Sequence, residues 1–359
     1  IKTLIVAQCN FTQVSFMKFI AILSSSPCFL HMESIDIGDV QNDQDFNCHI
    51  SQYLNSNELR LTNSLKSVRI ANCPLDIDSI LSLAALFNPS IEEIHFNDCK
   101  FLQKMIKSEN LSFQQITTFD FDKTTFSFEG IRSVFNELND KDIIKHLSLS
   151  KLKFSNDISP LFTIIGKYKL SYIESFDFSL NLIPQTAVDN FCEFITNMKR
   201  LRQLNITGIF PSVHTENIAK IAKAIRSVPT LETLIFKGVS NSQFGESFAK
   251  VIEQLPPSLI DLDISGQQIG NCGMALLSSY LQVGHLIRIR FSNPNCSNEQ
   301  YFRVLTEMIN SSLEDAVWNS EIDSLFHSPA DKERIAQLKS SFNEKFGNQS
   351  ENLKLSISA

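Results

Sequence analysis

Histidine and cysteine are the residue types in this sequence that could hold a metal ion or act as nucleophiles. The chain has seven histidines and eight cysteines, with no CxxC pair and no two histidines at the spacing of metal ligands. Cys48 and His49 are adjacent, but the sequence contains no second pair of this kind. Glycine-rich phosphate loops and the HExxH, GxSxG and protein-kinase signatures are also absent from it. We therefore expect a protein that is not an enzyme, with no catalytic residue, no metal site and no cofactor.

The cysteines are spread from Cys9 to Cys296 and form no short disulfide framework. Reduced thiols are typical of proteins that work in a reducing compartment. The distribution predicts reduced cysteines in the core of a cytoplasmic protein.

The charged residues are better candidates for a binding role. The formal net charge is −7 and the isoelectric point is near 5.6, whereas a nucleic-acid-binding domain is normally basic. No run of Lys and Arg is present. The longest apolar stretches, such as residues 80–87, are too short to span a bilayer. Composition therefore argues against nucleic acid and against a membrane span, and it leaves a protein as the expected partner.

The elements that position these charges follow one repeated pattern. Apolar residues occupy positions one, four and six of each unit, and a small residue, Asn or Cys often follows at position nine, as in Leu65, Val68, Ile70 and Cys73. Twelve such units begin 25 to 33 residues apart. They begin at Ile1, Met32, Leu65, Ile91, Ile116, Ile144, Ile173, Leu201, Leu231, Leu259, Leu286 and Leu313.

Each unit reads as a strand followed by a helix. The period-two alternation at positions four and six predicts a strand with one buried face. At position nine, a small or hydrogen-bonding side chain can pair with backbone groups that would otherwise be buried without a partner, a task that suits Cys9, Cys73, Cys99 and Asn181. In the second half of the units, apolar residues recur with the period of one helix face, as at Ile218, Ile221, Ala222 and Ile225.

Units of about 28 residues with full helices resemble the ribonuclease-inhibitor-like class of leucine-rich-repeat proteins. The resemblance covers residues 1–320, a domain of about 12 units. It implies an α/β solenoid, a right-handed superhelix of horseshoe shape, with parallel strands on the concave face and helices on the convex face. The sequence departs from the class in its 29 phenylalanines, where leucine is usual. We expect this difference to change core packing more than topology.

The two ends of the repeat array differ. Ile1 already occupies the first strand position, and an uncapped solenoid end exposes apolar surface, so we expect the chain to be a segment of a longer protein or to have lost an N-terminal region. Ser328, Pro329 and Asp331 read as the start of a helix, whose Ile335 and Phe342 share one face with Leu338. Residues 321–347 are therefore predicted to form a C-terminal capping region; a partner-binding or dimerising helix is the alternative. The polar residues 348–359 are predicted to be a mobile tail.

The candidate binding residues are the outward-pointing charges of the strands. Asp and Glu alternate there with Lys and Arg, and charge complementarity would orient a protein partner and speed its association. His95 and His146 could titrate on this surface, and Ile5, Ile235, Val317 and Trp318 could add apolar anchors. The predicted partner-binding residues are Asp36, Arg69, Glu93, His95, Asp120, Lys145, Asp177, Arg202, Glu232, Asp263 and Arg290.

These features favour a protein-interaction scaffold. Repeats of this class also occur in CARMIL-type actin regulators, so the resemblance implies actin-cytoskeleton regulation as one possible role. The alternative is a GTPase-activating protein of the RanGAP type, for which Arg69 or Arg132 could be considered, although no local motif selects either. A nuclease inhibitor would require a strongly acidic concave face, and the basic residues among the candidates weaken that hypothesis.

Overall fold

The computed structural model describes most of the strands and the helices of the C-terminal half. The ranges are 2–6, 31–38, 65–72, 91–101, 116–139, 143–154, 170–209, 215–239, 244–292, 295–318 and 328–347, with the single residues 9, 11, 12, 15, 18, 19, 22, 161, 162 and 164. The predicted ninth position at Cys73 and the predicted tail at 348–359 lie outside the described residues.

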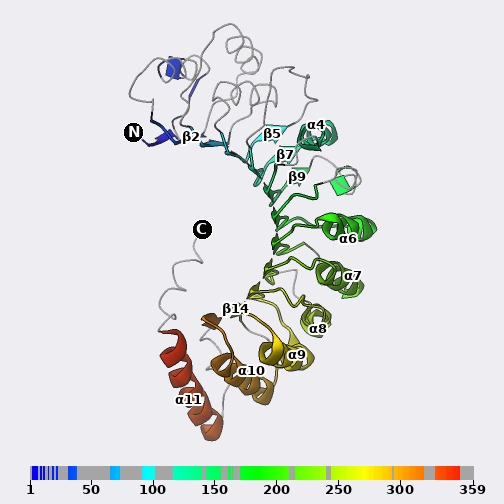
Figure 1. Ribbon diagram of the computed structural model, residues 1–359, viewed down its shortest axis with the longest axis vertical. Helices are drawn as coiled ribbons and strands as arrows, with labels where there is room; N and C mark the ends of the chain where they lie inside the picture. The colour runs from blue at the N-terminus through cyan, green and yellow to red at the C-terminus, as the bar shows by residue number, and fades with distance from the viewer. Residues whose placement is uncertain are drawn as a thin grey trace. The chain divides into compact units, whose positions relative to one another are not determined.

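The chain divides into two units, Ile1–Phe178 and Ser179–Ala359. In the first unit the strands are parallel, and they are neighbours in the order in which they occur along the chain (Figure 1). A separate set of short parallel strands follows some of them, and helix α4 spans Phe128–Asn139. The main strands are β1 (Thr3–Val6), β2 (Ser34–Gly38), β3 (Ser67–Ala71), β4 (Glu93–Asn97), β6 (Thr118–Asp120), β8 (His146–Ser148) and β10 (Ser175–Asp177), and the short ones are β5 (Lys100–Phe101), β7 (Thr125–Phe126) and β9 (Lys153–Phe154).

Phenylalanine fills the core of this unit where the repeat calls for leucine. Phe119 of β6 is buried in register with Ile94 of β4. The ring of Phe121 stacks on that of Phe119, with centroids 6.0 Å apart, and meets the ring of Phe126 edge-on at 5.5 Å. Each fully buried ring of this size contributes roughly 1.5–3 kcal/mol of transfer free energy. The parallel topology is retained, as expected from the sequence.

The second unit has the same alternation of strand and helix, and its helices are among the described residues. Figure 1 shows α6 to α10 following one another on one side of the strands, with α11 beyond α10, and consecutive helices pack against each other. The strands are β11 (Gln203–Asn205), β12 (Thr233–Ile235), β13 (Asp261–Asp263), β14 (Arg288–Phe291) and β15 (Asp315–Trp318); the helices are α6 (Val188–Asn197), α7 (Thr215–Arg226), α8 (Ala249–Glu253), α9 (Gly270–Val283), α10 (Asn298–Asn310) and α11 (Pro329–Phe346), and the 3-10 helices are η2 (Gln185–Ala187) and η3 (Gly245–Phe248).

The predicted helix faces are confirmed. Ile218, Ile221, Ala222 and Ile225 of α7 are all buried, and α7 packs against α6 and α8. The chain is therefore a leucine-rich-repeat solenoid of the α/β class, built from parallel strands with a helical side.

The prediction that the ninth position binds backbone groups is confirmed for Cys99 and for Asn181, which donates to the carbonyl of Ser179 at 3.3 Å, and is wrong for Cys9, which is exposed. Cys99 is buried and its thiol lies 3.5 Å from the carbonyl oxygen of Ile70. The hydroxyl of Thr124 donates to the carbonyl of Phe96 at 2.6 Å. The bonds of Cys99 and Thr124 each join one repeat to the repeat before it, and so pair a polar group that would otherwise be buried without a partner.

The prediction that the cysteines lie in the core is wrong for two of them. Cys9 and Cys272 are exposed, whereas Cys192 and Cys296 are partly buried. Cys9 follows β1, which is the end strand of the described sheet and has a neighbour on one side. Cys272 lies in the first turn of α9, whose buried residues Gly270, Gly273 and Met274 occupy the other face of the helix.

The start of the C-terminal helix agrees with the sequence. Ser328 is the N-cap of α11, and its hydroxyl accepts a hydrogen bond from the backbone N–H of Asp331 at 3.0 Å. Pro329 occupies the first turn, where its missing N–H costs nothing. Ile335 and Phe342 are buried, and α11 packs against α10.

Candidate functional site

The side chains predicted to bind a partner lie on the face of the strands opposite to the helical side. We call this face the open sheet face. Strand register aligns its side chains in rows, so that Asp36, Arg69, His95 and Asp120 are neighbours on β2, β3, β4 and β6. In the first unit its residues are Thr3, Ile5, Ser34, Asp36, Ser67, Arg69, Glu93, His95, Asn97, Asp120, Lys145 and Asp177; in the second they are Arg202, Glu232, Ile235, Lys237, Asp261, Asp263, Arg288, Arg290 and Asp315.

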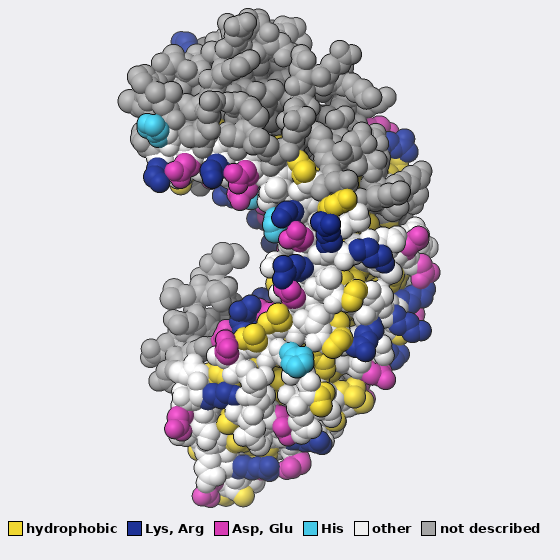
Figure 2. Space-filling view, in the orientation of Figure 1, with side chains coloured by type: hydrophobic (Ala, Val, Ile, Leu, Met, Phe, Trp, Pro, Cys, Tyr) yellow, Lys and Arg dark blue, Asp and Glu magenta, His cyan; other side chains and the backbone are white. Residues whose placement is uncertain are grey.

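Ion pairs between neighbouring strands hold these charges in place. In the first unit Lys145 lies 3.4 Å from Glu174, and Arg69 lies 3.3 Å from Asp36. Figure 2 shows basic and acidic side chains alternating along the edge of this unit. Exposed ion pairs add little to stability, typically about 0–1 kcal/mol each. Their effect here is to fix the positions of charges on an accessible surface.

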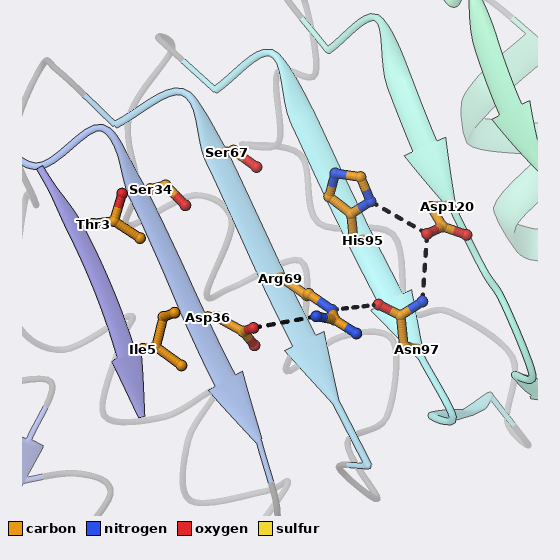
Figure 3. Close-up of a pocket in the computed structure, with 9 residues that line it drawn as sticks. All are labelled: Thr3, Ile5, Ser34, Asp36, Ser67, Arg69, His95, Asn97 and Asp120. Atoms are coloured by element: carbon orange, nitrogen blue, oxygen red, sulfur yellow. Dashed lines mark hydrogen bonds and ion pairs between the residues drawn. The ribbon is translucent and has the colours of Figure 1, made fainter. Parts of the chain in front are cut away.

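The first unit has a hollow of about 370 Å³ on its open sheet face (Figure 3). We call it the β1–β6 hollow. Its floor is formed by side chains that point out of five neighbouring strands, with the exposed Ile5 at one end and Asp120 at the other. The lining residues are Thr3, Ile5, Ser34, Asp36, Ser67, Arg69, His95, Asn97 and Asp120.

One hydrogen-bonded network crosses the hollow. Arg69 joins Asp36, at 3.3 Å, to the amide oxygen of Asn97, at 2.8 Å. The amide nitrogen of Asn97 then donates to Asp120 Oδ2 at 3.3 Å. His95 Nδ1 lies 3.2 Å from the same oxygen. Four strands are thus connected through their outward side chains, and Figure 3 shows the bonds running from Asp36 through Arg69 and Asn97 to Asp120 and back to His95.

His95 and Asp120 shift each other's protonation. The hydrogen bond with Asp120 raises the pKa of His95, despite burial, which lowers it, and Glu93 adds to the rise. Burial acts to raise the pKa of Asp120, but the hydrogen bonds with His95 and with the backbone N–H of Asp122 lower it below its ordinary value. The pair therefore favours an imidazolium beside a carboxylate.

The second unit has its own group of charges. Arg290 lies 3.2 Å from Asp261 and 3.7 Å from Asp315, and so connects β13, β14 and β15. Asp263 is only 4% exposed and is covered by Lys237, whose Nζ lies 3.1 Å away. Asp263 was predicted to contact a partner directly; its burial makes Lys237 the accessible charge at this position.

Several residues of the site were not found from the sequence. Asn97 and Lys237 lie two residues after His95 and Ile235, at the next outward position of the same alternation. Following the alternation for two more residues in each unit would have found them. Of the predicted apolar anchors, Ile5 is 66% exposed, Ile235 and Val317 are half-buried, and the side chain of Trp318 lies outside the described residues.

Two further kinds of feature, a metal-binding cluster and a membrane-spanning helix, are not found among the described residues. Within them, no group of three or more His, Cys, Asp or Glu side chains could hold a metal ion. No helix in the described ranges combines the length and the apolar character needed to cross a bilayer.

The comparisons with known proteins found matches among solved structures and in neither of the other two searches. No protein-family model matches the sequence, and no curated protein matches it. Among solved structures, the leucine-rich-repeat-containing protein LegL7 from Legionella pneumophila is 14% identical, with a TM-score of 0.49 over 94% of this chain and 98% of its own. A TLR13–ssRNA13 complex is 13% identical, with a TM-score of 0.49 over 82% of this chain. This chain spans 41% of the length of the TLR13 chain.

Proposed function

We propose that this chain is a protein-interaction scaffold whose open sheet face binds a protein partner. The observation that carries the proposal is the network from Asp36 to His95, which fixes charged and polar side chains on an accessible surface before any partner arrives. Charges that are already in place need less ordering on association, and complementary charges set orientation and association rate.

The alternative of a GTPase activator gains nothing from the two arginines considered for it. A catalytic arginine must reach the phosphates of a partner's nucleotide. Arg69 is held between Asp36 and Asn97. Arg132 lies on α4, with its guanidinium 5.5 Å from the centre of the Phe128 ring. The scaffold role therefore remains the proposal, and the partner's class is left to experiment.

An affinity pull-down from native lysate tests the proposal with one charge-altered variant of the face. The variant Glu93→Lys, Lys145→Glu, Glu232→Lys changes exposed side chains in both units. A matched control, Asp189→Lys, Lys220→Glu, Glu253→Lys, makes the same change in net charge on helices α6, α7 and α8.

The proposal predicts a protein that the parent and the helical control retain and the sheet-face variant loses. Recovery of actin regulators, a small GTPase or a nuclease would then distinguish the three classes of partner. A protein lost by the helical control and retained by the sheet-face variant would place binding on the helices and contradict the proposal. Circular dichroism must first show that all three proteins fold alike.

A further inference from the structure

The β1–β6 hollow offers more hydrogen-bond acceptors than its own network uses. Asp36 Oδ1 is buried and accepts no hydrogen bond, and Oδ2 accepts one long bond of 3.3 Å from Arg69. Oδ1 lies too deep to meet a ligand, whereas Oδ2 uses only one of its lone pairs, so a ligand donor in the hollow would bind Oδ2 beside Arg69.

Hydroxyl groups line the wall beside this carboxylate. Thr3, Ser34 and Ser67 are register neighbours on β1, β2 and β3. All three line the hollow, and Figure 3 shows Thr3, Ser34 and Ser67 in one row next to the row of Ile5, Asp36 and Arg69. A hydroxyl oxygen has two lone pairs and can accept from a cationic donor. Ile5, the register neighbour of Asp36 on β1, is 66% exposed and offers an apolar surface for an alkyl chain.

The charge of the lining favours a cation. Asp36 and Asp120 contribute two negative charges and Arg69 one positive charge. Counting Glu93, whose carboxylate lies 3.6 Å from His95, the hollow and its rim carry a net charge of about −2 with His95 neutral and about −1 with His95 protonated. An anionic ligand would meet these carboxylates, so it is disfavoured in either protonation state.

The pattern of free acceptors distinguishes lysine from arginine. A guanidinium binds best to a carboxylate with both oxygens available. Neither carboxylate of the hollow meets that requirement, because Asp36 Oδ2 accepts from Arg69 and both oxygens of Asp120 are engaged, by Asn97, by His95 and by the backbone N–H of Asp122. An ammonium group has three diverging donors and needs single acceptors, such as one oxygen of Asp36 and the hydroxyls of Ser34 and Ser67.

We propose that the β1–β6 hollow binds the ammonium group of a lysine side chain presented by the protein partner, with Asp36 as its ion-pair partner and Ile5 against its alkyl chain. This inference rests on the proposed function, because it takes the open sheet face as the binding surface. It adds the chemistry by which the first unit would recognise its partner.

Nuclear magnetic resonance of the full chain can test the hollow with defined probes. The Ile5 δ1 methyl and the His95 Cε1–H signals, assigned by Ile5→Val and His95→Gln, would be followed during titration with Nα-acetyl-lysine methylamide. The arginine and glutamate analogues serve as comparison probes. Asp36→Asn removes the proposed ion-pair partner, and Asp98→Asn removes an exposed carboxylate outside the hollow as the matched control.

The proposal predicts saturable shifts of both signals with the lysine probe and weaker binding of the arginine probe. Binding should weaken about tenfold in Asp36→Asn and remain unchanged in Asp98→Asn. Absence of shifts, equal binding of the glutamate probe, or full binding by a folded Asp36→Asn protein would overturn it. If the sheet-face variant loses its partner while the probes fail, the lysine inference fails alone; if the probes bind and the partner is retained, the proposed function fails.

Discussion

The Nζ atom of Lys345 lies 2.8 Å from the carbonyl oxygen of Ile309, at the C-terminal end of α10. The same ammonium lies 3.1 Å from the carbonyl oxygen of Met308 and 2.6 Å from that of Ser311. The last carbonyl groups of a helix have no partners within the helix, and a cation there is also favoured by the helix dipole. Lys345 of α11 therefore donates hydrogen bonds to the otherwise unpaired carbonyl groups at the end of α10.

Replacing Lys345 by Met should destabilise the protein by about 1 kcal/mol, because the carbonyl groups of α10 lose a charged donor while the alkyl chain is kept. Urea unfolding measures the change as a lower midpoint at unchanged slope. Lys332→Met, in the first turn of the same helix, is the control and should leave the midpoint unchanged or slightly raised. Equal midpoints for parent and Lys345→Met would show that the contact contributes nothing.

Burial of Phe342 and Phe346 against α10 makes α11 the candidate cap of the repeat array. Phe342→Asp should release α11 and expose the apolar side of α10, since a charge cannot remain buried there without a partner. We expect limited proteolysis to cut within 328–347 and light scattering to show concentration-dependent association. The exposed neighbour substitution Asn343→Asp should do neither. A protease-resistant, unassociated Phe342→Asp protein would mean that α11 does not cap the array.

The repeat architecture could be predicted because each element has its own local signal. Ile218, Ile221 and Ile225 mark one face of α7 by their spacing alone, and the alternation around Val68 and Ile70 marks β3. These periods follow from backbone geometry and need no knowledge of the rest of the chain. Cys99 could be assigned to the core for the same reason, because its place in the unit is fixed.

The hollow could not be predicted in the same way. Arg69 bonds to Asp36, 33 residues earlier, and to Asn97, 28 residues later. Both bonds depend on the register between strands and on how far a flexible side chain reaches. The repeat period of one unit specifies neither. Residue type was an equally poor guide for Cys272, which is apolar enough for the core but lies on the outer face of its helix.

Gly238 and Gly266 occupy equivalent places in neighbouring repeats, where the backbones approach closely. A β-carbon on Gly238 would lie 2.2 Å from the carbonyl oxygen of Gly266, which no side-chain rearrangement can relieve. Gly238→Ala should therefore destabilise the protein by about 3 kcal/mol or more. In the control Gly245→Ala the β-carbon meets no atom closer than 3.9 Å, so the positive φ of 54° is the main unfavourable term, at a cost of about 1–2 kcal/mol. Thermal unfolding of both variants tests the difference; similar losses would contradict the close approach.

The ion pair of His95 and Asp120 should make stability depend on pH in a defined window. The raised pKa of His95 contributes stability that is fully present below the unfolded-state pKa, about 6.5, and is lost as pH rises through the folded-state value. The lowered pKa of Asp120 contributes stability that is present above its unfolded-state value, about 3.9, and is lost as pH falls through the folded-state value. The pair is therefore most stabilising between about pH 5 and 6.

The charges that face His95 from its own and the adjoining strands are Arg69, Glu93 and Asp120, and they remain in His95→Gln. The free energy of unfolding of the parent minus that of His95→Gln should be larger at pH 5.5 than at pH 8.5, because only the protonated imidazole forms an ion pair with Asp120. Ser148→Ala, which replaces an uncharged side chain on β8, should show no such change. A difference that is constant over this range would mean that His95 does not take up its proton in the folded protein, and the assignment of an imidazolium to the hollow would fail.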